Sequence, residues 1–221
     1  MKQQVMQWAQ SFPYFAVLDN CDSSVDRYGK YELLAGVSTG LHGGLFHSLD
    51  ALMAAPPTWL MGAFPYELKD RLMSRLRSRH EPPVLFPELA WFEPEILVFI
   101  PRGGDELYRW HPDGAHPFSL PSVQAAPAPL SSPDFRSGFT REEYLQTIRR
   151  LQAHIREGDF YEINLAQAFT AYWAYNRPGE LFQRLTAVSP VPFSGAFRWQ
   201  GQYLIFAFPG RVFQMGGGTL R

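Results

Sequence analysis

The sequence predicts an α+β fold in which two largely antiparallel β-sheets are flanked by helices. The candidate strands follow one another as hairpins, and strands and helices do not alternate regularly as they do in a parallel sheet. The chain is 221 residues long, with 46% hydrophobic and 15% aromatic residues. This composition is sufficient for a substantial core, so we expect one large folded domain or two small ones.

The first part of the chain, residues 1–111, contains short elements of both kinds. We expect helices over residues 2–10, 48–55 and 68–79, strands over 14–18, 31–37 and 59–66, and a hairpin from 96–100 and 106–111. The hairpin turns at the sequence RGGD. The third helix carries Leu68, Leu72 and Leu76 four residues apart, which predicts one apolar stripe on an otherwise basic helix.

A linker is expected over residues 112–139, because residues 112–133 are rich in Pro, Ala and Ser and have little periodicity. The clearest helix of the chain follows it. Thr140 and Glu143 match a capping box, and Gly158 is placed to end the helix after an apolar stripe along one face.

The stretch EGDFYEINLAQAF begins at Glu157 and changes the sequence period from helical to two. This alternation predicts a core strand over residues 161–169, with large apolar side chains on one face. Glu162 and Asn164 then project from the other face, about 6.5–7 Å apart. Together with Gln167, they either organise a polar ligand pocket or hydrogen-bond a neighbouring strand and loop.

The end of the chain again predicts hairpins. We expect a helix over residues 177–185, with Pro178 in its first turn, and a hairpin of PFSGAFRW and QYLIFAF around Gln200 and Gly201. RVFQM, GGG and TLR begin another hairpin, and the chain ends at Arg221 inside a strand with its pairing unfinished. Because an unpaired apolar strand edge favours association, we expect a homodimer through this edge.

Charge and cysteine content narrow the function classes. Lys and Arg number 20 and Asp and Glu number 21, so the formal net charge of -1 gives no electrostatic footprint for nucleic acid or an anionic membrane. No apolar run approaches the roughly 18 residues of a membrane span, and the N-terminus lacks a signal sequence. The one cysteine, Cys21, excludes an intramolecular disulfide. We therefore expect a cytoplasmic protein.

Simple catalytic and metal-binding patterns are weak. His42 and His47 lack nearby Cys, Asp or Glu at ligand spacing, so we expect no metal site. The GGG sequence near the end matches no phosphate-binding motif. Ser194 and Cys21 are nucleophiles by residue type, but the sequence places no base beside either one, which favours structural roles.

The stretch GDFYEINLAQAF follows a helix that opens with REEY at Arg141, and this combination resembles the chorismate-utilising enzymes. That family includes anthranilate synthase component I and aminodeoxychorismate synthase component I. WLMGAFPYELKD, FPELAWFEPEILVFI and SPVPFSGAFRW resemble other family segments, and matches span most of residues 14–213. The resemblance implies a truncated anthranilate synthase component I-like fold, with residues 1–111 as its N-terminal region and 140–221 as the incomplete start of its chorismate-binding region.

The sequence VLDN at residues 17–20 helps to choose a branch of the family. Anthranilate synthases usually carry LLES there, and VLDN is closer to aminodeoxychorismate synthases. The resemblance thus implies amination of chorismate to 4-amino-4-deoxychorismate for para-aminobenzoate and folate synthesis. It also implies a glutamine amidotransferase subunit as ammonia source, and Mg²⁺ in the complete enzyme but no cofactor in this chain. Anthranilate synthase component I stays the alternative, because the discriminating residue lies beyond Arg221.

The chain departs from the family at functional positions. Gly210 stands where a functional Glu is expected, and Phe206 and Phe208 stand where serines are usual. Glycine has no side chain with which to shuttle a proton. The family segments that hold Mg²⁺ and the chorismate carboxylate would follow Arg221. We therefore expect no catalytic residue in this chain, and we expect the chain to be inactive as it stands.

The resemblance also implies a tryptophan site between the N-terminal loop and the PFS segment. The matching positions are Asn20, Tyr28, Gly29, Lys30, Tyr31, Pro192, Phe193 and Ser194. Aromatic rings at these positions offer stacking faces, and Asn20 with backbone groups suits the charged ends of an amino acid. Two interpretations stay open: a non-catalytic module that binds an aromatic amino acid or docks a subunit, and ordinary packing at a sheet edge.

Overall fold

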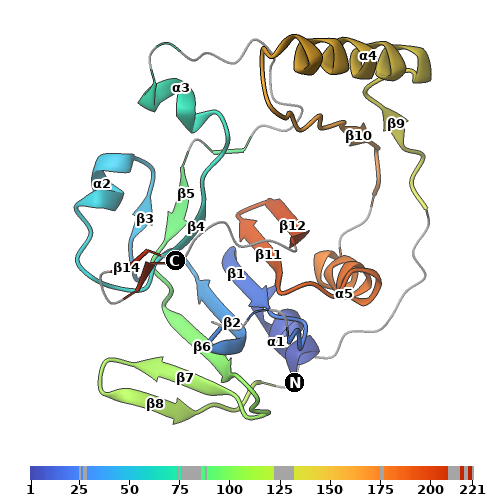
Figure 1. The fold of residues 1–221 in the computed structure, drawn as a ribbon. Helices are drawn as coiled ribbons and strands as arrows, with labels where there is room; N and C mark the ends of the chain where they lie inside the picture. The colour runs from blue at the N-terminus through green and yellow to red at the C-terminus, as the bar shows by residue number, and fades with distance from the viewer. Residues whose placement is uncertain are drawn as a thin grey trace. The chain divides into compact units, whose positions relative to one another are not determined.

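The computed structural model of the chain describes residues 1–24, 26, 29–73, 75, 86–87, 89–121, 132–174, 177–208, 215–216 and 219–220 (Figure 1). The chain divides into two compact units. Unit 1 comprises Met1–Ala125 and Arg177–Arg221, and unit 2 comprises Ala126–Asn176. Within the described ranges, no helix combines the length and the apolar character needed to cross a membrane.

Unit 1 is built on a seven-stranded antiparallel sheet with the strand order β12-β11-β1-β2-β6-β7-β8 (Figure 1). Its strands are β1 (Tyr14–Asp19), β2 (Tyr31–Ser38), β6 (Ile96–Pro101), β7 (Tyr108–His111), β8 (Gly114–Pro117), β11 (Phe193–Trp199) and β12 (Gln202–Phe208). Although β1 and β11 are far apart in the sequence, they pair directly, with Asp19 opposite Ser194. This pairing joins the two chain segments of unit 1 in one sheet.

Unit 1 also contains smaller helices and strands. They are α1 (Lys2–Ala9), β3 (Leu45–Phe46), α2 (Leu49–Met53), β4 (Met61–Ala63), α3 (Leu68–Leu72), β5 (Ala90–Phe92), α5 (Pro178–Val188), β13 (Met215–Gly216) and β14 (Thr219–Leu220). Strands β3, β5 and β4 form a second antiparallel sheet in that order, and β13 pairs with β14. The predicted fold class, α+β with two largely antiparallel sheets and flanking helices, is confirmed.

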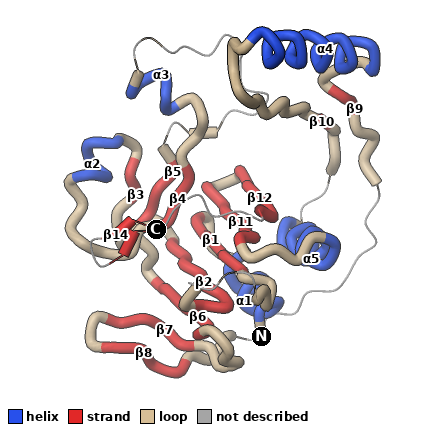
Figure 2. Tube along the Cα trace, viewed as in Figure 1, coloured by secondary structure: helices blue, strands red, loops and turns tan. Residues whose placement is uncertain are grey.

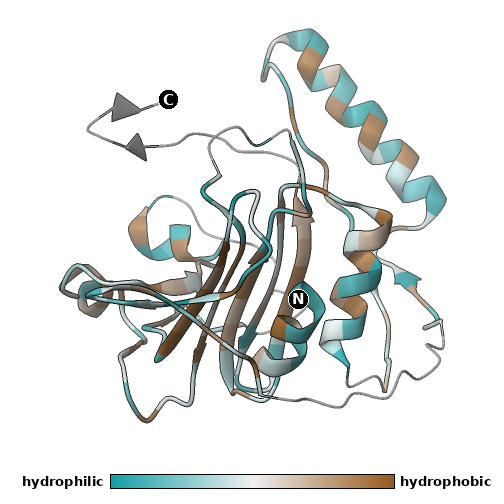
Figure 3. Ribbon diagram, turned by 90° about the horizontal axis from the view of Figure 1, so that it is seen from below, coloured by the Kyte–Doolittle hydropathy of each residue, from teal (hydrophilic) through white to brown (hydrophobic). Residues whose placement is uncertain are grey.

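The two faces of the large sheet pack on different elements. On one face, Phe15 and Val17 of β1 are fully buried in a cluster that includes residues of α1 and α5. On the other face, Tyr14 and Ala16 belong to a cluster that includes residues of β4 and β5. Successive β1 side chains therefore serve two separate cores, and hydrophobic residues follow the strands of this sheet (Figure 3).

Unit 2 consists of α4 (Arg141–Glu157), β9 (Arg136–Ser137) and β10 (Phe169–Thr170), in which β9 pairs with β10. The predicted capping box of α4 is present. Glu143 N donates to Thr140 Oγ1 at 3.2 Å, and Thr140 N donates to Glu143 Oε2 at 2.8 Å. Gly158 ends the helix with a φ of 82°, a left-handed conformation that glycine adopts without strain. Both ends of this helix are confirmed as predicted.

The alternating stretch after α4 contradicts the prediction of a core strand over residues 161–169. Only Phe169 belongs to a strand, and the preceding residues form a loop between α4 and β10 (Figure 2). Tyr161 is 93% exposed, and Ile163 is 46% exposed. The alternation specifies which side chains share a face, but a strand also needs a neighbouring strand whose backbone groups pair with its own. Among the described residues, only the two-residue strand β9 pairs with the end of this segment, at Phe169.

Three further predictions of local structure need correction. The strand expected over residues 59–66 is limited to Met61–Ala63, because Pro65 lacks a donor for the ladder, and Phe64 is exposed. The helix expected over residues 68–79 ends at Leu72 with Met73 as its C-cap, and residues 74 and 76–79 lie outside the described residues. The expected linker contains β8, which pairs with β7 across a two-residue turn, so the Pro-rich composition concealed a hairpin.

Candidate ligand-binding site

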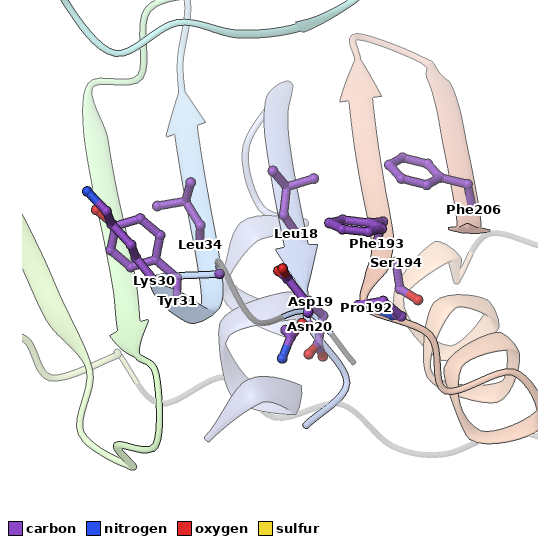
Figure 4. A pocket seen from close by; sticks show the side chains of 12 residues that line it. Leu18, Asp19, Asn20, Lys30, Tyr31, Leu34, Pro192, Phe193, Ser194 and Phe206 are labelled. Carbon is purple, nitrogen blue, oxygen red and sulfur yellow. The ribbon is translucent and has the colours of Figure 1, made fainter. Parts of the chain in front are cut away.

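A cavity of about 330 Å³ opens at one end of the large sheet, where β1 ends and β2 and β11 begin (Figure 4). Because β11, β1 and β2 are neighbours in the sheet, residues from both chain segments of unit 1 face the same space. The lining residues are Leu18, Asp19, Asn20, Asp26, Gly29, Lys30, Tyr31, Leu34, Pro192, Phe193, Ser194 and Phe206. The cavity has the size of a small-molecule site.

The cavity brings together seven of the eight residues expected from the resemblance to line a tryptophan site: Asn20, Gly29, Lys30, Tyr31, Pro192, Phe193 and Ser194. The eighth, Tyr28, lies outside the described residues. The sequence alone did not mark the other five lining residues: Leu18, Asp19, Asp26, Leu34 and Phe206. Four of these five lie in strands and are located by strand register, which single-sequence patterns do not specify.

Register explains the apolar wall of the cavity. Leu18 lies opposite Leu34 on β2 and opposite Gly195 on β11, and Gly195 lies opposite Phe206 on β12. A Cβ atom at Gly195 would approach Phe206 Cζ to 2.5 Å and Leu18 Cδ2 to 3.1 Å. The missing side chain at this position therefore allows the Phe206 ring and Leu18 to approach each other across β11.

The polar end of the cavity is formed by Asn20, which is 6% exposed. Asn20 Nδ2 donates to Ser23 O at 3.2 Å and to Glu32 Oε2 at 3.3 Å. Asn20 Oδ1 is buried and has no hydrogen-bond partner among the described residues. An acceptor in this state is destabilising unless a donor reaches it, so this atom is suited to an N–H or O–H group of a ligand.

Gly29 is required by a close approach within the loop that closes this end. A Cβ atom at Gly29 would lie 2.4 Å from Asp26 Oδ2 and 3.2 Å from Arg102 Nη1. Any larger residue would therefore displace the buried Asp26 carboxylate or the Arg102 guanidinium. This contact gives a physical reason for glycine at a position that the resemblance alone had marked.

Asp19 also lines the cavity, but its carboxylate is bound to helix α1. Lys2 Nζ lies 2.8 Å from Asp19 Oδ1 and 2.9 Å from Asp22 Oδ1. Burial acts to lower the pKa of Lys2, but hydrogen bonds to the two carboxylates outweigh it, so the pKa is raised. Asp19 Oδ1 accepts a further hydrogen bond from Cys21 N at 2.7 Å. These contacts hold the end of β1 against α1.

The two candidate nucleophiles have structural surroundings. Burial raises the pKa of the Cys21 thiol, so the reactive thiolate is disfavoured at neutral pH. Ser194 is 1% exposed, and its Oγ donates to Val191 O at 3.0 Å. A serine whose hydroxyl proton points to a backbone carbonyl is not prepared for nucleophilic attack.

The three motif residues of the alternating stretch do not line this cavity. Glu162, Asn164 and Gln167 belong to unit 2, whereas all the lining residues belong to unit 1. Glu162 and Asn164 are exposed, and Gln167 Nε2 donates to Ser137 Oγ in β9. Among the described residues, Gln167 thus makes a local contact that holds the start of β10 near β9.

In unit 2, three side chains of the kinds that bind metal ions lie close together. Ligand atoms of His154, Glu157 and Asp159 lie within 4.8 Å of one another on the exposed surface, and His154 Nδ1 lies 2.6 Å from Asp159 Oδ2. Mg²⁺ prefers an octahedral set of oxygen ligands. A group that contains an imidazole already paired with a carboxylate does not fit this ion. Gly210, which stands where a Glu is expected, lies outside the described residues.

Comparison with known proteins adds a family match to this geometry. A family model described as chorismate binding enzyme matches residues 22–221. Aminodeoxychorismate synthase component 1 of Klebsiella aerogenes is 27% identical over 168 residues, covering 73% of this chain and 36% of that protein. The Escherichia coli protein of the same name is 29% identical over 156 residues, covering 68% of this chain and 34% of that protein.

Anthranilate synthases are also among the relatives. Anthranilate synthase component 1 1 of Haloarcula marismortui is 31% identical over 100 residues, covering 45% of this chain and 20% of that protein. The chain spans about a third of the length of the two aminodeoxychorismate synthases that it matches. Nine of the twelve residues that line the cavity lie within the matched range 22–221, and Leu18, Asp19 and Asn20 precede it.

Proposed function

The chain belongs to the family of chorismate binding enzymes, and from this premise we propose that it is an aminodeoxychorismate synthase component I-like protein that binds an aromatic amino acid. The complete enzyme of this type converts chorismate to 4-amino-4-deoxychorismate for folate synthesis, with Mg²⁺ and with ammonia from a glutamine amidotransferase subunit. The relatives with this name and the VLDN sequence support this branch. Anthranilate synthase component I remains the alternative within the family.

The cavity at the end of β1 is the observation that carries the amino-acid-binding function. Phe193, Tyr31 and Phe206 supply aromatic rings, Asn20 Oδ1 supplies an acceptor for an ammonium group, and Lys30 supplies a cation for a carboxylate. These groups match the three parts of an aromatic amino acid. Binding in this cavity involves no covalent step, so the role of the described residues is recognition rather than chemistry.

Calorimetric titration with L-tryptophan tests this function. We expect saturable heat for the wild-type chain and at least a roughly tenfold loss of affinity for Phe193→Ala, since the variant removes a ring from the cavity wall. Phe169→Ala is the matched control, because Phe169 is an exposed residue of unit 2. Absence of heat at millimolar tryptophan in the wild-type chain contradicts the proposal.

We further propose that these 221 residues alone do not convert chorismate, because Gly210 replaces the Glu expected to take part in proton transfer. Incubation with chorismate, ammonium and Mg²⁺ tests this statement. Formation of aminodeoxychorismate or anthranilate above the uncatalysed background would overturn it. A gain of activity in Gly210→Glu would show that this position limits the reaction.

Self-association through a strand edge is a separate part of the proposal. β12 is a terminal strand of the seven-stranded sheet, and its Leu204 and Phe208 are exposed. Exposed apolar strand edges favour pairing with another chain. We expect sedimentation analysis to detect a dimer at micromolar concentration, and a monomer over that range would contradict this part. A cytoplasmic location is proposed from the single cysteine.

A further inference from the structure

The amide of Asn20 has a fixed orientation in the cavity. Its Nδ2 group faces two acceptors, Ser23 O at 3.2 Å and Glu32 Oε2 at 3.3 Å, and its Oδ1 atom has no partner among the described residues. Rotating the amide by 180° would place Oδ1 against those two acceptors. Because oxygen would then face oxygen twice, the observed orientation is strongly favoured. Asn20 therefore presents a hydrogen-bond acceptor, Oδ1, to this end of the cavity.

Glu32 sets this orientation from outside the cavity. It is 8% exposed and is not among the lining residues. Its Oε1 atom accepts from Gly103 N at 3.2 Å and lies 3.3 Å from Arg102 Nε, which leaves Oε2 for Asn20. Arg102 Nη2 also donates to Ser23 O at 2.7 Å. Arg102, at the end of β6, thus contacts both Ser23 O and Glu32, the two groups that hold the Asn20 amide.

We propose that Glu32 is a positioning residue that makes the cavity selective for ligands with a primary ammonium group, by fixing Asn20 with Oδ1 as the free acceptor. This inference rests on the proposed binding of an aromatic amino acid, and it adds the origin of the selectivity. An ammonium group donates to Asn20 Oδ1, whereas an analogue without the amino group leaves this buried acceptor unpaired. Loss of a hydrogen bond to a charged donor corresponds to roughly ten- to hundredfold in affinity.

Glu32→Gln separates positioning from general support of the fold. Glutamine has the shape of glutamate but only one oxygen. The Gly103 N–H and Arg102 Nε–H groups require that oxygen at the Oε1 position, so the new NH₂ group faces Asn20. Asn20 then keeps Ser23 O as an acceptor on this side but meets an NH₂ group in place of Glu32 Oε2, so neither orientation of its amide satisfies both neighbours. The variant therefore no longer fixes Oδ1 as the atom that Asn20 presents to the ligand.

The measurement is the ratio of two dissociation constants, that of indole-3-propionate divided by that of L-tryptophan. The two ligands differ in the α-amino group. We expect a ratio of at least roughly ten for the wild-type chain and a fall to about one in Glu32→Gln. Glu93→Gln is the matched control, because Glu93 lies elsewhere in unit 1, where it accepts from Thr58 Oγ1. A general loss of stability lowers both affinities and leaves the ratio unchanged.

Asn20→Leu provides a second variant of similar volume that removes the acceptor directly. We expect it to lower the ratio to about one, and we expect no further fall in the double variant, because both changes act on the same atom. A wild-type ratio above ten that persists in Glu32→Gln overturns the positioning role while the binding function stands. A wild-type chain that binds neither ligand overturns the binding function and this inference together.

Discussion

Strand β11 of unit 1 and the segment 161–169 of unit 2 have similar alternation of side chains but different backbone partners. β11 pairs with β1 on one side and β12 on the other, and most of its side chains are buried. In segment 161–169, only Phe169 pairs, opposite Ser137, and Tyr161, Ile163 and Phe169 are exposed. Burial in this molecule therefore follows the number of paired neighbours rather than the hydrophobic pattern alone.

This difference indicates where the stability of the described chain resides. Unit 1 contains two buried clusters, one on each face of its sheet. In unit 2, α4 has no buried residue, so its capping contacts and local hydrogen bonds make up much of what holds it. Substitutions of the same type should then have large effects in unit 1 and small effects in unit 2.

The largest expected effect tests this comparison with a matched pair of phenylalanines. Phe15 is 0% exposed in β1, whereas Phe169 is 60% exposed in β10. We expect Phe15→Ala to lower the free energy of unfolding by about 3–5 kcal/mol, because it leaves a cavity in the core. Phe169→Ala should change it by less than about 0.5 kcal/mol. Urea unfolding followed by circular dichroism measures both, and similar losses would contradict the comparison.

The sequence predicted local elements well because their causes are local. The capping box of Thr140 and Glu143, the C-terminal Gly158 and the hairpin around Gly201 depend on neighbouring residues. The pairing of β1 with β11 depends on segments far apart in the chain, and no single-sequence pattern specifies it. For the same reason, Phe206 was not expected in the cavity, since only register places it opposite Gly195.

The candidate site was found by resemblance rather than by pattern. Asn20 and Phe193 match no chemical motif, and only the resemblance of VLDN and SPVPFSGAFRW to family segments marked both of them. The role of Glu32 had no sequence signal, because it depends on a hydrogen bond to Asn20 and on Arg102 at the end of another strand.

A smaller effect on the free energy of unfolding is expected from substitution of Glu95, whose carboxylate holds the loop at residues 38–42. Burial acts to raise its pKa, but hydrogen bonds from Thr39, His42 and Ser38 outweigh burial, and the pKa lies below its usual value of 4.5. Because the folded-state pKa is depressed, the stabilisation is complete above pH 4.5 and is lost as pH falls through the folded-state value.

Glu95→Gln tests this pH dependence. At pH 7 we expect a loss of about 1 kcal/mol in the free energy of unfolding, since charged acceptors form stronger hydrogen bonds and Glu95 is partly exposed. The difference from the wild-type chain should shrink as pH falls below 4.5. Glu93→Gln, with one hydrogen bond from Thr58, is the control. A difference that stays constant between pH 7 and pH 3 would exclude the proposed linkage.

In unit 2, the capping box predicts an effect that remains local. Thr140→Ala removes the acceptor for Glu143 N, and we expect α4 to lose about 1 kcal/mol of helix stability. Thr147→Ala is the matched control, because Thr147 lies inside the helix and its hydroxyl only donates to Glu143 O. Hydrogen exchange should be faster in the first turn of α4 for Thr140→Ala alone. An equal change in the strands of unit 1 would show that the two units unfold together.

The smallest expected effect concerns Tyr161, the residue that the alternating pattern assigned to the core with large apolar neighbours. Tyr161 is 93% exposed, so Tyr161→Ala removes almost no buried surface, and we expect a change of less than about 0.5 kcal/mol in the free energy of unfolding. Tyr14→Ala is the matched variant, because Tyr14 packs edge-on against Trp199 and accepts from Gln200 Nε2 at its hydroxyl. A loss above about 2 kcal/mol for Tyr161→Ala would mean that Tyr161 is buried against a partner in solution. Segment 161–169 would then have a packing partner other than β9.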